Sequence, residues 1–151
     1  MGTRSVIAIP HGDAWRGRYV HWDGYPTHMA KALTDIVRRD GLSKAILTLT
    51  ESFYGWSSIS ATQVDESNET DFDTDRFASV AGFGTAYTDE PDNWLTPDPE
   101  WSWTEWAYVL CPTGLLIVKQ GYQEPDRAIG LFDWNTDHDW SQVESDVYDS
   151  V

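Results

Sequence analysis

The sequence predicts an α+β fold in which an antiparallel sheet of about five or six strands carries one main helix, residues 26–40, on one face. Short apolar runs separated by turn residues predict the strands, and a single stretch of helical periodicity predicts the helix. The chain has 151 residues, the usual size of one domain, and its 40% apolar content includes nine tryptophans. We therefore expect one domain, residues 1–151, with a core that needs no disulfide.

The first element is a β-hairpin. Ser5–Ile9 has the composition of a buried strand, the segment 10–13 has turn chemistry, and Gly17–Trp22 is the second strand. Alternation along that second strand places Tyr19, His21 and Asp23 on one face. The other face receives Arg18, Val20 and Trp22.

The helix at 26–40 has the clearest pattern in the chain. Pro26 suits the first helical position, where its missing N–H has no cost. The apolar stripe recurs with a spacing of three and four residues, and it consists of Met29, Ala32, Leu33, Ile36 and Val37. Arg38 and Arg39 complement the helix dipole in the last turn, and Gly41 follows as a capping residue.

The remaining elements are shorter. Residues 42–51 fit either a short helix or a strand, and we expect strands at 82–88, 103–110, 115–120 and 128–134. The segment 111–114 is a hairpin loop between two of them. Residues 57–76 and 89–100 are predicted acidic loops, and the acidic tail 141–151 is predicted to be loosely held.

The charge is strongly negative and unevenly distributed. The net charge is −15 at pH 7; residues 1–44 hold seven of the ten basic residues against four acids, whereas residues 45–151 hold three against twenty-one. Free nucleic acid is excluded as a partner of the acidic part, because phosphates are bound by cations. A partner protein with a basic surface fits, and solubility alone is the alternative explanation.

The composition also bears on location. No stretch approaches the roughly 20 apolar residues of a membrane span, and the apolar run within residues 1–10 is too short for a signal-peptide core. The single cysteine, Cys111, suits a reducing compartment. We expect a cytoplasmic protein that does not associate with membranes, and its oligomeric state stays open.

The most distinctive segment is 17–26, where a strand ends, a turn follows and the helix begins. A helix start offers free N–H groups and partial positive charge, and the basic side chains beside it make an anion site conceivable. The candidate ligand-binding residues are Arg4, Arg18, His21, Asp23 and Gly24. His21 and Asp23 also suit an acid–base pair, but Asp23 and Gly24 are equally explained as turn formers.

The segments 1–5 and 17–26 (Gly-Arg-Tyr-Val-His-Trp-Asp-Gly-Tyr-Pro) resemble a group of uncharacterised proteins encoded by bacteriophages, notably those of actinobacteria. Residues 82–87 and 104–110 are similar to segments of longer members. The resemblance implies a setting, a phage accessory protein in the host cytoplasm, and no activity.

Other motifs are weaker. Asp133, Asn135, Asp137 and Glu144 match part of a calcium-loop spacing, but His138 stands where the loop needs glycine, and we expect no calcium and no cofactor. The triplet Asp71, Asp73 and Asp75 fits a solvated loop. Four tryptophans, Trp94, Trp101, Trp103 and Trp106, surround an acidic loop and suit either core packing or a contact surface.

These observations leave three functional hypotheses. The first is a non-catalytic phage protein that binds or inhibits a host protein with a basic surface. On this hypothesis the acidic surface imitates the charge of a nucleic acid. The second is a protein or hydrolase that binds a phosphorylated small molecule, such as a nucleotide, at the helix start. The third is a structural or regulatory accessory protein.

Overall fold

The computed structural model describes residues 3–64, 76–88, 94–97, 104–121 and 124–149. The strands in chain order are β1 (Ser5–His11), β2 (Ala14–Val20), β3 (Gly55–Ile59), β4 (Phe77–Val80), β5 (Gly84–Tyr87), β6 (Trp106–Cys111), β7 (Gly114–Gly121) and β8 (Glu124–Asp133). The helical elements are α1 (Pro26–Asp40), α2 (Leu42–Ile46), the π-helical turn η1 (Leu47–Glu51) and α3 (Trp140–Asp149).

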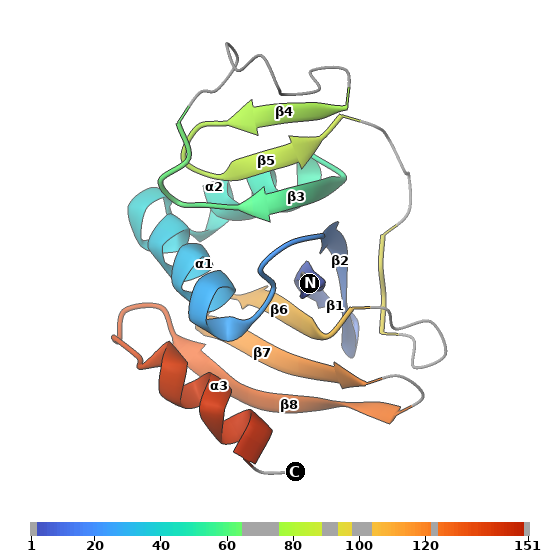
Figure 1. Ribbon diagram of the computed structural model, residues 1–151, viewed down its shortest axis with the longest axis vertical. Helices are drawn as coiled ribbons and strands as arrows, with labels where there is room; N and C mark the ends of the chain where they lie inside the picture. The colour runs from blue at the N-terminus through green and yellow to red at the C-terminus, as the bar shows by residue number, and fades with distance from the viewer. Residues whose placement is uncertain (1–2, 65–75, 89–93, 98–103, 122–123, 150–151) are drawn as a thin grey trace.

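The predicted α+β class is confirmed, but the predicted sheet is wrong in size and direction. Eight strands form one mixed sheet in the order β4-β5-β3-β2-β1-β6-β7-β8 (Figure 1). Two of its pairs are parallel, β1 with β6 and β2 with β3. β2 and β3 are parallel because the helical segment 26–51 connects them. A connection through helices crosses over the sheet and brings the next strand back beside β2 in the same direction.

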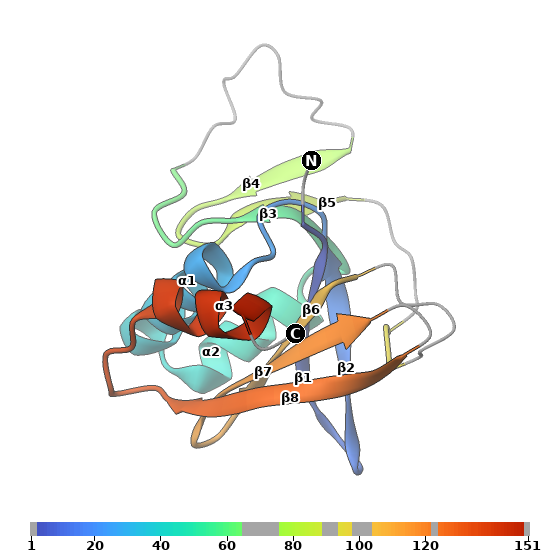
Figure 2. The ribbon, with the colours of Figure 1, turned by 60° about the horizontal axis from the view of Figure 1, so that its bottom comes forward.

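The main helix has the predicted bounds and packs its apolar stripe on one face of the sheet. Met29, Leu33 and Ile36 are fully buried, and they belong to one cluster with large side chains of the sheet, among them Trp56 and Tyr108. Gly41 ends the helix at φ +87°, which a glycine adopts without strain. This helix and α3 lie side by side over the sheet (Figures 1 and 2).

Two strands of the sheet were not predicted. β3 occupies 55–59, so the first acidic loop does not begin at 57, and β4 occupies 77–80, directly after the predicted loop. The greater part of that predicted loop, 65–75, lies outside the described residues, as do 89–93 and 98–100 of the second. The segment 42–51 is helical, which settles the choice that its pattern left open.

Within the tail predicted to be loosely held, the described residues are helical: residues 140–149 form α3. Its first turn is capped by Asp139, whose carboxylate accepts a hydrogen bond from the Gln142 N–H at 3.1 Å. Val143 and Val147, four residues apart, face the core cluster. The abundance of acids in this segment suggested a solvated tail, but the apolar spacing determined its structure.

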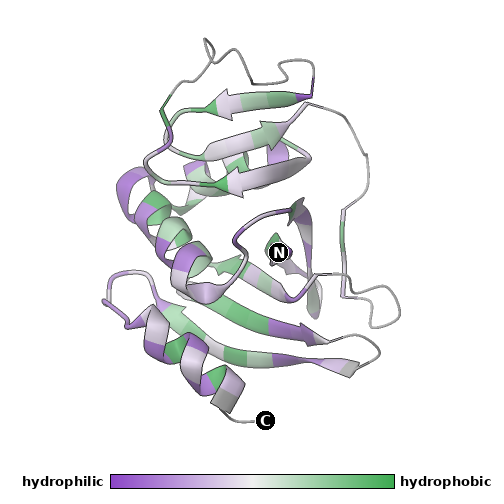
Figure 3. Ribbon diagram, in the orientation of Figure 1, coloured by the Kyte–Doolittle hydropathy of each residue, from purple (hydrophilic) through white to green (hydrophobic). Residues whose placement is uncertain are grey.

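The other face of the sheet carries a smaller apolar cluster, which comprises Val6, Ala8, Trp15, Ala107, Val109 and Val118. Leu95 packs against it and pairs its backbone with Gly17, with N···O distances of 2.8 and 2.9 Å. Figure 3 shows hydrophobic colours in the middle of the sheet and hydrophilic colours on the outer sides of the helices. Among the helices described, none is both long and apolar enough to span a bilayer.

Candidate functional site

The structure separates the predicted basic residues onto two faces of the sheet. Arg18 lies opposite Ile7 in the β1–β2 register and therefore points to the helical side. Its side chain is 4% exposed, and its Nε donates to the Thr50 carbonyl at 2.8 Å. Its guanidinium also lies 3.4 Å from the centre of the Trp94 ring. Arg18 thus fastens η1 and the segment 94–97 to β2, and it does not join Arg4 and His21.

Arg4 and His21 do come together, on the face away from the helices, through Tyr19. The Tyr19 hydroxyl lies 2.8 Å from Nδ1 of His21. Burial raises the pKa of Tyr19, and Arg4 opposes that rise by its charge and by a side-chain hydrogen bond to the same hydroxyl. The sequence analysis did not include Tyr19 among the candidate ligand-binding residues, although strand alternation already placed it on the same face as His21.

Asp23 and Gly24 serve the turn before α1. Asp23, not Gly24, holds the left-handed conformation, with φ +57°, and its side chain hydrogen bonds to Tyr25. Gly24 lies where two segments approach closely: its N–H donates to the Thr3 carbonyl at 2.8 Å, and its carbonyl accepts from the buried Tyr108 hydroxyl at 2.6 Å. Since Asp23 and His21 have different partners, they do not form an acid–base pair.

The start of α1 already holds an anion, the carboxylate of Glu144 from α3. One oxygen of Glu144 accepts hydrogen bonds from the Thr27 N–H at 3.0 Å and from the Thr27 hydroxyl at 2.9 Å. The carboxylate therefore satisfies a free N–H of the first turn and complements the helix dipole. The anion site expected at this helix start is filled by the protein itself.

The calcium-like spacing does not produce a cluster of ligands. Asp133 accepts a hydrogen bond from the Asn135 N–H, Asp137 pairs with Arg38 at 2.9 Å, and Glu144 caps α1. Within the described residues, no group of three His, Cys, Asp or Glu side chains is arranged to hold a metal ion. The triplet Asp71, Asp73 and Asp75 lies outside them.

The tryptophan cluster is only partly described. Trp106 is fully buried in the core, and Trp94 is half-buried against Arg16 and Arg18, so both serve packing. Trp101 and Trp103 lie outside the described residues. Cys111 is half-buried, and burial raises the pKa of its thiol, which lowers the thiolate fraction at neutral pH.

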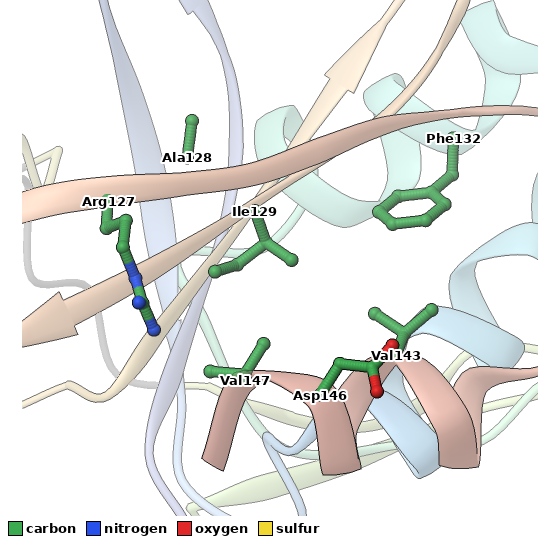
Figure 4. A pocket seen from close by; sticks show the side chains of 7 residues that line it. All are labelled: Arg127, Ala128, Ile129, Phe132, Val143, Asp146 and Val147. Atoms are coloured by element: carbon green, nitrogen blue, oxygen red, sulfur yellow. The ribbon is translucent and has the colours of Figure 1, made fainter. Parts of the chain in front are cut away.

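A feature that the sequence did not reveal is an open groove of about 390 Å³ between β8 and α3. Figure 4 shows Arg127, Ile129 and Phe132 of β8 directed toward α3, which contributes Val143, Asp146 and Val147. The groove has an apolar floor with one residue of each charge among its lining residues. The available signals were the apolar spacing of 143 and 147 and the uncharged run 128–132, but their proximity depends on the tertiary fold.

The groove lies along an edge of the sheet, because β8 is the last strand in the order. The strand begins with charged residues and continues with the uncharged run 128–132, Ala-Ile-Gly-Leu-Phe. Leu131 in that run is 54% exposed, although edge strands are commonly protected by charges. In Figure 3 the start of β8 is hydrophilic and its middle hydrophobic.

Comparisons with models of protein families, with curated proteins and with solved structures find no match to this chain.

Proposed function

We propose that this chain is an acidic binding protein that recognises a partner protein with a basic surface, and that it binds through β8 and α3. The uncharged stretch 128–132 on an edge strand supports this proposal most directly. An exposed edge with apolar side chains is a ready template for association with another chain. The adjacent groove has room for apolar side chains of the partner.

The charge around the groove indicates which partner is favoured. Residues 133–149 contain six acids and neither lysine nor arginine. Asp133, Asp137, Asp139 and Asp146 in this stretch are exposed. A partner with lysine or arginine around an apolar segment is complementary to this surface, and the long-range attraction speeds its association.

The same charges disfavour a second copy of the chain at this edge. Two copies related by symmetry bring identical acidic stretches together, and like charges across an interface oppose association. The resemblance to phage proteins makes a host protein the expected partner, and one that handles nucleic acid has the required basic surface. In that case the acidic surface imitates the charge of the nucleic acid.

Site-specific photo-crosslinking in cells tests the proposal. A photoreactive residue at Leu131 is expected to capture a basic protein, whereas the same residue at Lys31, on the outer side of α1, is expected not to capture it. The affinity of the purified pair should fall steeply with added salt, because screening acts beyond roughly 8 Å at physiological ionic strength.

A pair of matched variants completes the test. Leu131→Lys places a charge in the proposed interface and should weaken binding at least tenfold. Val64→Lys makes the same change at a residue that is 64% exposed and distant in sequence from β8, and it should have no effect. Equal affinity in both variants, or a partner whose binding ignores salt, contradicts the proposal.

A further inference from the structure

The face of the sheet away from the helices carries a group of polar side chains that has no part in the proposed binding of a partner protein. Tyr19 lies beside Gly55 in the β2–β3 register, and a side chain added at Gly55 would meet the Tyr87 ring at 3.3 Å. Tyr19 and Tyr87 therefore flank the same glycine on one face. We call the group the tyrosine–arginine patch, and it consists of Arg4, Tyr19, His21 and Tyr87.

The hydrogen bonds on the Tyr19 side leave a donor available. The Tyr19 hydroxyl shares a hydrogen bond of 2.8 Å with Nδ1 of His21, and Arg4 hydrogen bonds to the same hydroxyl. The other ring nitrogen of His21, Nε2, has no hydrogen bond to a described residue and can donate one to a ligand when it carries a proton.

The Tyr87 side has the same character. Ser57 hydrogen bonds to the Tyr87 hydroxyl, and the charge of Arg76 lies close enough to lower the pKa of that phenol, although burial raises it more strongly. The two tyrosine hydroxyls are near enough that the ionisation of Tyr87 would raise the pKa of Tyr19. With Ser57 as the donor, the O–H of Tyr87 is free to donate outward.

Arg4 brings a positive charge to the Tyr19 hydroxyl. Among the described residues no carboxylate forms a salt bridge with Arg4, whereas Lys31, Arg38 and Arg39 each pair with an aspartate.

We propose that the tyrosine–arginine patch binds the phosphate group of a small molecule. Arg4, His21 and Tyr87 supply N–H and O–H donors on one face, and a phosphate has oxygens enough to accept from several of them. Guanidinium groups match phosphate geometry and keep their charge at any physiological pH. The half-buried rings of Tyr19 and Tyr87 and the exposed ring of Trp22 offer apolar surface to the rest of the ligand.

Titration with inorganic phosphate and with adenosine monophosphate, followed by nitrogen NMR of the histidine rings and arginine side chains, tests the proposal. Both probes are expected to shift His21 Nε2 and the guanidinium of Arg4. A much lower dissociation constant for the nucleotide assigns the site to nucleotides, whereas equal constants assign it to the phosphate group alone. Unchanged resonances of both residues with both probes overturn the proposal.

Variants provide the control for net charge. Arg4→Gln should weaken phosphate binding at least tenfold, because hydrogen bonds to charged groups are strong. Tyr87→Phe, which keeps the ring and removes only the hydroxyl, should weaken it several-fold. Lys31→Gln removes one positive charge on the helical side and should leave the affinity unchanged. Equal weakening in Arg4→Gln and Lys31→Gln refutes a specific site.

Discussion

Removal of the Glu144 carboxylate is expected to destabilise the protein, because this group joins α3 to the start of α1. In Glu144→Ala, the N–H and hydroxyl of Thr27 lose the acceptor that lies 3.0 and 2.9 Å away. Loss of a helix cap costs about 0.5–2 kcal/mol, and loss of a negative charge at a helix start costs about 0.3–1 kcal/mol. Because the site is partly exposed, we expect about 1–2 kcal/mol in total, and a melting temperature lower by roughly 2–8 °C.

Urea unfolding followed by circular dichroism measures this change, and Glu51→Gln and Glu144→Gln form a matched pair. Glu51 is exposed at the end of η1 and has no hydrogen-bond partner or salt bridge among the described residues, so its substitution changes only the net charge. Glu144→Gln should be the less stable of the two. Equal stability of the pair would show that the carboxylate of Glu144 does not hold the helix start.

Two further predictions concern the turn before α1 and the start of β8. Gly24→Ala should destabilise the protein strongly, since the new Cβ would lie 2.6 Å from the Cβ of Ser5 and 2.7 Å from the Thr3 carbonyl oxygen. The Cβ of Gly12→Ala would meet nothing within 4 Å, so this variant should lose only the stability that alanine loses at a positive φ. Similar melting temperatures of the two variants would refute the steric argument. Burial raises the pKa of Asp126, so its charged form opposes folding above that pKa and the penalty disappears as protonation proceeds at lower pH. Asp126→Asn should therefore raise the melting temperature at pH 7 and not at pH 3, and a gain that is equal at both pH values would contradict the desolvation argument.

Local pattern predicted the elements whose own residues determine them. The main helix has its predicted bounds because its stripe, its Pro26 start and its Gly41 end all agree. The β1–β2 and β6–β7 hairpins were found because short turns join alternating strands. β3 and β4 were missed because they are short and contain small or polar residues, and they are held by pairing with distant strands.

The candidate site shows where sequence reasoning was sufficient and where it was not. Strand alternation already assigned Arg18 and His21 to opposite faces, so a single site that used both was inconsistent with the pattern itself. The capping of α1 by Glu144 joins residues separated by 117 positions, and no local signal specifies it. Likewise, Tyr87 reaches the patch only because β5 pairs with β3, which pairs with β2.

The arrangement of charge argues against solubility as the whole explanation of the acidic composition. A requirement for solubility alone is met by acids on any surface, and it gives no reason for the uncharged stretch 128–132 on an edge strand. In this chain the acidic stretch 133–149 lies beside the groove, and Arg4 lies with Tyr19 on the face of the sheet away from the helices. The two proposed surfaces are consequently separable: Leu131→Lys should reduce partner binding and leave the phosphate titration unchanged, and Arg4→Gln should do the reverse. If either substitution impaired both activities equally, the two surfaces would not be independent, and a common effect on the fold would be the simpler account.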